Sequence, residues 1–303
     1  MITVAGLTKK FGPITAVNNI AFGVATGEVL GFLGPNGAGK STTLRMLAGY
    51  LQPCAGTITI SGINIAENPI DAKKKIGYMP ETTPLYREMT AQEYLTFIAE
   101  AHALDDVHAR VQKIMETANL GAIRHQLIGT ISKGFRSRLN FAAAIIHDPP
   151  VLLLDEPTDG LDPNQKNEIR KLIKTLSRNK AIIVSTHILE EVEAMCSRII
   201  IISEGTLVLD GTADDMRHKA DHKRSAILSI SPQDKAAAEK LLGSTLASLG
   251  AGPDHFERFR LNTNESPTTL GSRLTAAGIS CEESCYYDVP LDDAFRHLTR
   301  TKE

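Results

Sequence analysis

The chain has 303 residues, of which 42% are hydrophobic and 22% charged, an ordinary composition for a folded globular protein of one or two domains. Its formal net charge of −2 supplies no overall field that would attract nucleic acid, so no nucleic-acid partner is expected. The apolar runs are far shorter than the ~18 residues that span a bilayer, and the N-terminus lacks a signal-peptide pattern. We therefore expect neither a transmembrane helix nor a signal peptide.

The first 80 residues predict short strands around a phosphate-binding unit. The segments "ITVAGL", "GEVLGFL" and "TITISG" are strand-like and are bounded by Gly, Pro and Asn turns. After the apolar strand at residues 29–33, a glycine-rich turn leads into a helix that is expected to begin near Gly39. This strand–loop–helix order is the context in which a phosphate-binding loop occurs.

The turn fits the P-loop pattern completely, as Gly34-x-x-x-x-Gly39-Lys40-Ser41. Glycines allow backbone N–H groups to turn onto phosphates, Lys40 reaches the β- and γ-phosphates, and the Ser41 hydroxyl ligates Mg²⁺. A glycine-rich turn without a ligand is the alternative, and the correct flanking elements disfavour it. The other expected nucleotide contacts of this loop are Asn36, Gly37, Ala38 and Thr42.

From about residue 88 to 148 the periodicity is helical, as in "TAQEYLTFIAEAHAL" and "DDVHARVQKIMETANL". The last of these helices, "TISKGFRSRLNFAAAII", begins with Ser132 at its cap and Gly134 two positions on. A helix N-terminus offers unpaired N–H groups that suit an anion. On these residues alone, an ordinary capped helix is the favoured interpretation.

The apolar strand "PVLLLDEP" ends in two adjacent acids, Asp155 and Glu156. Ligands of open α/β sheets bind at the carboxyl ends of parallel strands, so both side chains are expected at a ligand site. Asp155 suits a Mg²⁺ ion held through water, and Glu156 suits orientation or deprotonation of an attacking water. Helix capping is the alternative role for such a pair of acids.

A different pattern follows "MRHKADHKR", and residues 216–224 predict a solvated linker, with a phospholipid-facing patch as the alternative. Beyond it, strand-like and helical segments alternate as β-α-β-α-β, with one helix expected over "DKAAAEKLLGSTLASL". This order predicts a small α+β domain at residues 225–303, for which a ferredoxin-like arrangement is one candidate.

Together these residues resemble the ATP-binding subunits of ABC transporters, over roughly residues 1–210. "ISKGF" stands where that family has its signature loop, "DGLDP" with Asp162 matches the D-loop, and "STHILEEVEAMCSRIIIISEG" contains the switch His187. Phe11 falls where the family stacks an aromatic ring on adenine. The resemblance implies an ABC-type P-loop NTPase domain over 1–215, with a mixed sheet core, an antiparallel β subdomain and the inserted helical subdomain.

The resemblance also implies function. ATP and Mg²⁺ are the expected cofactors, Glu156 and His187 the catalytic residues, and Ser41, Glu81 and Asp155 the metal ligands. Two such domains pack head to tail, as a homodimer or with a paired ATPase subunit, so that Ser132 and Gly134 cap a nucleotide on the other subunit. The subunit would lie at the cytoplasmic face of a membrane and power an integral-membrane permease.

The branch that the chain resembles contains exporters of the multidrug and gliding-motility type. A soluble ABC ATPase that acts on ribosomes or DNA is the alternative, although such proteins generally carry two fused ATPase domains or a long coiled coil.

Two departures from the family pattern stand out. The signature Leu-Ser-Gly-Gly-Gln is replaced by residues 131–135 with Lys133 in third place, and Glu81 replaces the usual Gln. Lys133 is expected either to contact the partner's phosphate or to be solvated.

Overall fold

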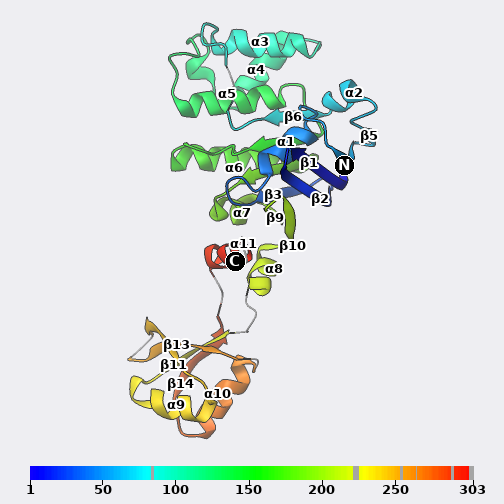
Figure 1. Cartoon of the computed structure of the whole chain (residues 1–303). Helices are drawn as coiled ribbons and strands as arrows, with labels where there is room; N and C mark the ends of the chain where they lie inside the picture. Colours follow the sequence, from blue (N-terminus) through cyan, green and yellow to red (C-terminus); the bar gives the residue numbers. More distant parts are fainter. Residues whose placement is uncertain (83–84, 221–224, 253–254, 264, 288–289, 300–303) are drawn as a thin grey trace. The chain divides into compact units, whose positions relative to one another are not determined.

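The computed structural model describes residues 1–82, 85–220, 225–252, 255–263, 265–287 and 290–299 (Figure 1). The chain divides into two compact units, Met1–Ala213 and Asp214–Glu303. Each unit has a hydrophobic core of its own among these residues.

The central sheet of unit 1 has six strands in the order β10-β9-β3-β8-β7-β6. Neighbours from β9 to β6 run parallel, whereas β10 is antiparallel to β9. The sheet is therefore mixed, as expected. Its strands are β3 (Val29–Leu33), β6 (Ile76–Met79), β7 (Val151–Asp155), β8 (Ala181–Thr186), β9 (Arg198–Ser203) and β10 (Thr206–Gly211).

A second sheet of unit 1 is antiparallel, in the order β2-β1-β4-β5. Its apolar side chains pack with those of the central sheet in one core, which confirms the expected antiparallel subdomain. The strands of this sheet are β1 (Ile2–Phe11), β2 (Ile14–Val24), β4 (Ala55–Ile60) and β5 (Ile63–Asn64).

The middle strands of the central sheet position the functional residues. Every residue of β3, β7 and β8 is buried, as expected for parallel strands covered on both faces. The carboxyl ends of parallel strands lie at one edge of a sheet. At this edge β3 is followed by the loop that precedes Lys40. At the same edge β7 ends at Asp155, β8 leads into His187, and β6 leads toward Glu81.

Helices α1, α5 and α7 contact strands of the central sheet, and three helices, α3, α4 and α5, form the expected insertion between β6 and β7. The inserted α3, α4 and α5 gather at one end of unit 1 (Figure 1) and share a core that includes Leu95, Met115 and Leu139. Thr90 and Glu93 form a capping box that starts α3. The helices of unit 1 are α1 (Lys40–Leu47), α2 (Pro69–Lys73), α3 (Ala91–Ala101), α4 (Val107–Thr117), η1 (Gly121–Ile123), α5 (Lys133–Ile145), α6 (Pro163–Ser177) and α7 (Leu189–Met195).

Unit 2 contains a four-stranded antiparallel sheet in the order β12-β13-β11-β14. With α9 and α10 the connectivity is β-α-β-β-α-β, the order found in ferredoxin-like domains. The helix α8 (Ala213–Ala220) begins at the boundary between the units. The other elements are β11 (Ser225–Ile230), η2 (Pro232–Asp234), α9 (Lys235–Leu242), β12 (Ala247–Ala251), β13 (Glu257–Asn262), α10 (Pro267–Ala276), β14 (Cys281–Tyr286) and α11 (Leu291–Thr299).

Two sequence expectations differ from this structure. Residues 216–220 of the expected linker belong to helix α8, and residues 221–224 lie outside the described part of the chain. The helix expected over residues 234–249 ends at Leu242, because Gly243 adopts the left-handed conformation with φ of 65° and closes the helix. Beyond it, β12 pairs with the distant β13, so this domain has one strand more than the local pattern indicated.

Among the described residues, no helix combines the length and the apolar character that crossing a membrane requires.

Candidate functional site

A pocket of about 430 Å³ opens at the carboxyl edge of the central sheet. The P-loop, the end of β7 and the residue after β8 all contribute to it, as the fold requires. The residues that line it are Asn36, Gly37, Gly39, Lys40, Ser41, Thr42, Glu81, Glu156, Asp159 and His187. Nine of these ten were expected at a nucleotide site from the sequence, and the structure brings them together.

Two P-loop glycines are required by close approaches of the backbone. A Cβ on Gly34 would lie 2.4 Å from the carbonyl oxygen of Ile202, so no side chain fits there. Gly39 has φ of 107°, and a Cβ on it would meet the carbonyl oxygen of Ala16 at 2.4 Å. Because Gly39 is the N-cap of α1, the positive end of this helix opens directly at the pocket.

Lys40 is held within the loop that precedes it. Its Nζ donates hydrogen bonds to the carbonyl oxygens of Gly34 at 2.7 Å and Pro35 at 3.2 Å. The side chain is buried, and burial lowers the pKa of the ammonium, whereas the nearby carboxylates, led by Glu156, oppose that shift. A phosphate in the pocket would favour the charged ammonium further, so the lysine is arranged to receive an anion.

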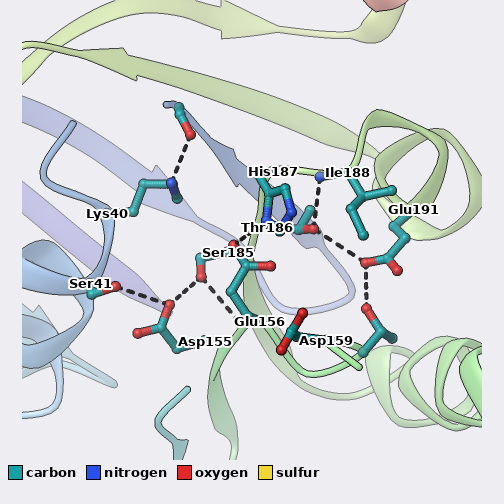
Figure 2. A network of polar contacts seen from close by, with 12 residues as sticks. Lys40, Ser41, Asp155, Glu156, Asp159, Ser185, Thr186, His187, Ile188 and Glu191 are labelled. Carbon is teal, nitrogen blue, oxygen red and sulfur yellow. Dashed lines mark hydrogen bonds and ion pairs between the residues drawn. The ribbon is translucent and has the colours of Figure 1, made fainter. Parts of the chain in front are cut away.

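Ser41, Asp155 and Ser185 form a chain of hydrogen bonds below the pocket (Figure 2). The Ser41 Oγ donates to Asp155 Oδ1 at 3.3 Å, and the Ser185 Oγ donates to the same oxygen. Asp155 itself is buried, with 2% of its surface exposed. Its carboxylate is thereby fixed beside the hydroxyl that P-loops use as a metal ligand.

Glu156 and His187 lie side by side at the pocket (Figure 2). The His187 Nδ1 lies 3.0 Å from Glu156 Oε1. Burial raises the pKa of Glu156, and the hydrogen bond with His187 opposes this rise. A carboxylate whose pKa is above its ordinary value is a better proton acceptor near neutral pH, so Glu156 has the chemistry of a general base.

The backbone of Glu156 adopts an uncommon conformation. Its φ of 49° lies in the left-handed region, which side chains other than glycine enter at a cost of about 1–2 kcal/mol. The N–H of Glu156 donates to the carbonyl oxygen of Ser185 at 3.1 Å and thereby holds this conformation. The turn directs the carboxylate into the pocket immediately after the buried strand β7.

The oxygen atoms near the P-loop have the chemistry of a magnesium site. Within the described residues, no group of three His, Cys, Asp or Glu side chains could by itself hold a metal ion. Mg²⁺ sites on phosphates need few protein ligands, because phosphate oxygens and waters complete the octahedron. The Ser41 hydroxyl beside Asp155, with Glu81 lining the same pocket, is such a set of hard oxygen donors.

The residues of the signature loop behave differently. Ser132 caps α5 through its Oγ, which accepts from the N–H of Phe135 at 3.3 Å. A Cβ on Gly134 would lie 2.4 Å from the side chain of Gln165, so this glycine lets α5 approach α6. Of the described residues, neither Ser132 nor Gly134 lines the pocket of its own chain. Their contact with a nucleotide on another subunit stays a prediction.

Lys133 was expected to contact the partner's phosphate or to be solvated, but in the structure it makes a different contact. Its Nζ forms an ion pair with Asp159 Oδ2 at 2.9 Å within the same chain, and this contact lowers the pKa of Asp159. Gly160 makes room for the lysine, because a Cβ there would lie 2.1 Å from its Nζ. Asp159 lines the pocket but was absent from the predicted site; its position within the D-loop motif was the available signal.

Three other predicted contacts lie outside the pocket lining. Phe11 ends β1 with 48% of its surface exposed, and Lys9 lies over its ring. Ala38 is buried in the core beside the P-loop. Asp162 caps α6 by accepting a hydrogen bond from the N–H of Gln165 at 2.9 Å. Their contacts with nucleotide remain predictions.

Comparisons with known proteins agree with this geometry. The sequence model of the family described as "ABC transporter" matches residues 17–159. The linearmycin resistance ATP-binding protein LnrL of Bacillus subtilis is 38% identical over 219 residues, which are 71% of this chain and 70% of that protein. The bacitracin transport ATP-binding protein BcrA of Bacillus licheniformis is 36% identical over 238 residues, which are 78% of this chain and 77% of that protein.

A solved structure is similar as well. It is the dimeric, post-hydrolysis state of an ATP-binding cassette with bound ADP and Pi, and it aligns with a TM-score of 0.65 and 26% identity over 70% of this chain and 98% of that one. The sheet, the P-loop pocket and the relatives lead to one conclusion: the chain belongs to the ABC transporter family, as an ATP-binding subunit that hydrolyses ATP.

Proposed function

We propose that this subunit drives an exporter from the cytoplasmic face of a membrane, by closing and reopening a head-to-tail ATPase dimer on a separate permease. The observation that carries the proposal is that the P-loop and the Glu156–His187 pair line one and the same pocket. Relatives named for linearmycin resistance and bacitracin transport support the assignment to an exporter.

ATP binding begins at the P-loop. The N–H groups at the start of α1 and the Lys40 ammonium contact the phosphates, and the backbone carbonyls of Gly34 and Pro35 keep the ammonium in place. Ser41, Asp155 and Glu81 would hold Mg²⁺, Asp155 through water. When bound, this ion neutralises charge on the β- and γ-phosphates.

Glu156 then acts on the water that attacks the γ-phosphate. Its carboxylate orients this water and accepts a proton from it as the new bond to the γ-phosphorus forms and the bond from that phosphorus to the β–γ bridging oxygen breaks, which releases ADP and phosphate. His187 holds the carboxylate through the contact at 3.0 Å, so that the acceptor oxygen stays directed into the pocket. The buried setting of Glu156, with 11% of its side chain exposed, limits competition from bulk water.

The second subunit is proposed to complete the site. Ser132 and Gly134 lie outside the pocket of their own chain, which supports a role toward the nucleotide of a partner. The dimeric cassette to which this chain is similar supports the same arrangement. In this proposal the start of α5 reaches the γ-phosphate only when two subunits close on ATP.

We propose a groove of about 590 Å³ next to the Glu81 loop as the docking place of the permease. Pro80 and Thr82, which flank Glu81, line this groove. Exposed Tyr50 and the half-buried Ile98 of α3 lie on the same groove, so it offers an accessible surface with both apolar and polar side chains. A helix of the permease seated there would touch the loop that carries Glu81.

Co-purification of the tagged full-length chain from detergent-solubilised membranes tests the proposal. A multi-span membrane protein should be recovered with it, and recovery of ribosomes or DNA instead would overturn the exporter assignment. Tyr50→Arg, in the groove, should abolish this recovery and leave basal ATPase activity in place. Ile14→Arg is a matched control, because Ile14 is 67% exposed and Tyr50 72% exposed, but Ile14 lies on β2.

A further inference from the structure

Glu191 is a buried carboxylate that the proposed mechanism leaves unused. It lies on α7, and none of its surface is exposed. An ionised side chain in such a position is costly unless other groups compensate its charge and satisfy its oxygens. The contacts of Glu191 therefore show what this charge is retained for.

One oxygen of Glu191 receives two hydroxyl groups from different segments (Figure 2). Thr158 Oγ1 donates to Oε2, and Thr186 Oγ1 donates to the same atom at 3.2 Å. Thr186 Oγ1 in turn accepts the N–H of Ile188 at 3.1 Å, so its proton is available for Glu191. The carboxylate thus acts as an acceptor that joins two loops.

Two cations compensate the charge. Lys166 Nζ lies 3.1 Å from Glu191 Oε1, and Arg170 Nη2 lies 3.8 Å from the same atom. Both cations come from α6, which follows the D-loop, and their side chains are mostly buried. Glu191 therefore also fastens α7 to α6.

The positions of the two threonines give this network its significance. Thr158 follows Glu156 by two residues, and Thr186 directly precedes His187. The carboxylate of Glu191 is consequently bonded to both segments that carry the pair of residues facing each other in the pocket. Neither Thr158 nor Glu191 lines the pocket, so Glu191 can act on the reaction only through these segments.

We infer that Glu191 is a positioning residue for ATP hydrolysis, which holds Glu156 and His187 at the separation where they contact each other. This inference rests on the catalytic roles proposed above for those two residues. The binding of ATP by the P-loop is not expected to depend on it, because the described contacts of Glu191 are with Thr158, Thr186 and two cations of α6, none of which belongs to that loop. Loss of Glu191 should therefore impair turnover more than nucleotide binding.

Glu191→Gln is the main test, because it keeps the shape of the side chain. The amide cannot reproduce both sets of contacts. If its NH₂ group takes the place of Oε2, it can accept from neither threonine hydroxyl, and if it takes the place of Oε1, a hydrogen-bond donor faces the Lys166 ammonium. We expect kcat per nucleotide-binding site to fall about tenfold, while the Kd for ATP stays within about threefold. Glu190→Gln is the matched control: this neighbour on α7 is 83% exposed and pairs at 3.9 Å with Arg170 rather than with either threonine, so its change should leave both constants unchanged.

Two further measurements separate positioning from folding. The imidazole resonances of His187 should shift in Glu191→Gln but not in Glu190→Gln. Combined with His187→Ala, Glu191→Gln should cost less than the product of the two single losses, since both changes disturb one contact. An unchanged kcat per binding site, unchanged resonances or fully multiplicative losses would each overturn the inference.

The failure of the proposed roles would look different. If Glu156→Gln and His187→Ala left hydrolysis unaffected, the assignment of these catalytic residues would be wrong. The resonance shift of His187 in Glu191→Gln would still report whether the buried carboxylate sets the position of that imidazole. Should Glu191→Ala fail to fold, Glu191→Gln and its exposed control keep the test complete.

Discussion

Helices α1 and α5 both begin with sequences that suit an anion, yet their first turns are used differently in the isolated chain. The start of α1 is formed by Gly39 and opens at the pocket of the same chain. The start of α5 is capped by Ser132, whose Oγ already accepts the N–H of Phe135. Lys133 is likewise engaged, with Asp159.

This difference agrees with the division of roles proposed above. In that proposal the start of α1 binds phosphate within its own subunit, because the P-loop and Lys40 surround it. The polar side chains at the start of α5 have partners within the chain, so this helix end is stable without a ligand before a second subunit binds. The predictions below test whether α1 serves its own nucleotide and α5 that of a partner.

The largest effect is expected from Lys40→Ala. Removal of the ammonium should weaken ATP binding about 10- to 100-fold, the range that a lost charged hydrogen bond produces. Equilibrium titration with a fluorescent ATP analogue gives the Kd of the variant and of the unchanged protein. Glu156→Gln is the control, since it should retain ATP binding and abolish most hydrolysis. Equal loss of binding in both variants would contradict the division of roles between Lys40 and Glu156.

Ser132→Arg should abolish hydrolysis without weakening ATP binding to the single subunit. The arginine obstructs a composite site built on the P-loop of the other subunit. Mixing Lys40→Ala chains with Ser132→Arg chains places both lesions in one site and leaves the other intact. Mixed dimers should therefore regain ATPase activity above both parents, up to about half of the wild-type rate if the sites are independent.

The activity of the mixed dimers shows whether the start of α5 acts on the nucleotide of the partner subunit. If activity never returns, and Glu156→Gln chains stay monomeric on size exclusion at saturating ATP, α5 does not serve a partner's nucleotide. Measurement of ATP binding by Ser132→Arg chains alone, and of the folded state of Lys40→Ala chains alone, shows that neither variant is inactive because it is unfolded.

His187→Ala should move the acidic limb of the kcat profile to higher pH. Glu156 must be deprotonated to accept a proton, so kcat falls as pH decreases through its pKa. Burial raises this pKa and the His187 contact lowers it, so removing His187 raises it further. Measurement of kcat across pH tests this result, with His108→Ala on α4 as the control. If the acidic limb stayed at the same pH in His187→Ala, His187 would not lower the pKa of Glu156.

Glu81→Gln should raise the Mg²⁺ concentration needed for half-maximal hydrolysis, by about threefold. A carboxylate is a stronger hard-oxygen ligand than an amide, and Glu81 lines the pocket. Titration of ATPase activity with Mg²⁺ at saturating ATP gives the value. Identical Mg²⁺ titrations for Glu81→Gln and the unchanged protein would mean that the Glu81 side chain does not reach the metal.

The smallest effect is expected from Lys133→Ala. Both members of the Lys133–Asp159 pair are at least half exposed, so its loss should change the free energy of unfolding by less than about 1 kcal/mol. A double-mutant cycle with Asp159→Asn in chemical denaturation measures this coupling. If Lys133→Ala instead slowed hydrolysis more than tenfold, the lysine would serve the partner's phosphate rather than Asp159.

The sequence allowed most of the nucleotide site to be predicted, because its residues form local motifs. Gly39, Lys40 and Ser41 are fixed by their spacing after a strand, and Asp155 and Glu156 by their place at the end of one. The network of Glu191 could not be predicted in this way. Thr158 and the two cations of α6 lie between 21 and 33 residues before Glu191 in the chain, and only the tertiary structure brings them together.

The same distinction applies to the fold. The helices of the insertion were visible because their apolar periodicity extends over whole turns, and α3 carries its own capping box. The strand β12 was read as helix because residues 234–249 contain good helix formers. Its pairing with β13 is a contact between distant segments, which outweighs local preference. Likewise Lys133 was expected near phosphate or solvent, since nothing in its own segment indicated Asp159.

The left-handed backbone of Glu156 places stability and turnover in opposition. A glycine at this position would relieve the conformation at φ of 49°, but it would also remove the carboxylate that we propose acts on water. A β-branched or bulky side chain would keep the cost in free energy and remove the carboxylate as well. Stability alone would therefore favour a glycine here, whereas the proposed hydrolysis requires the glutamate.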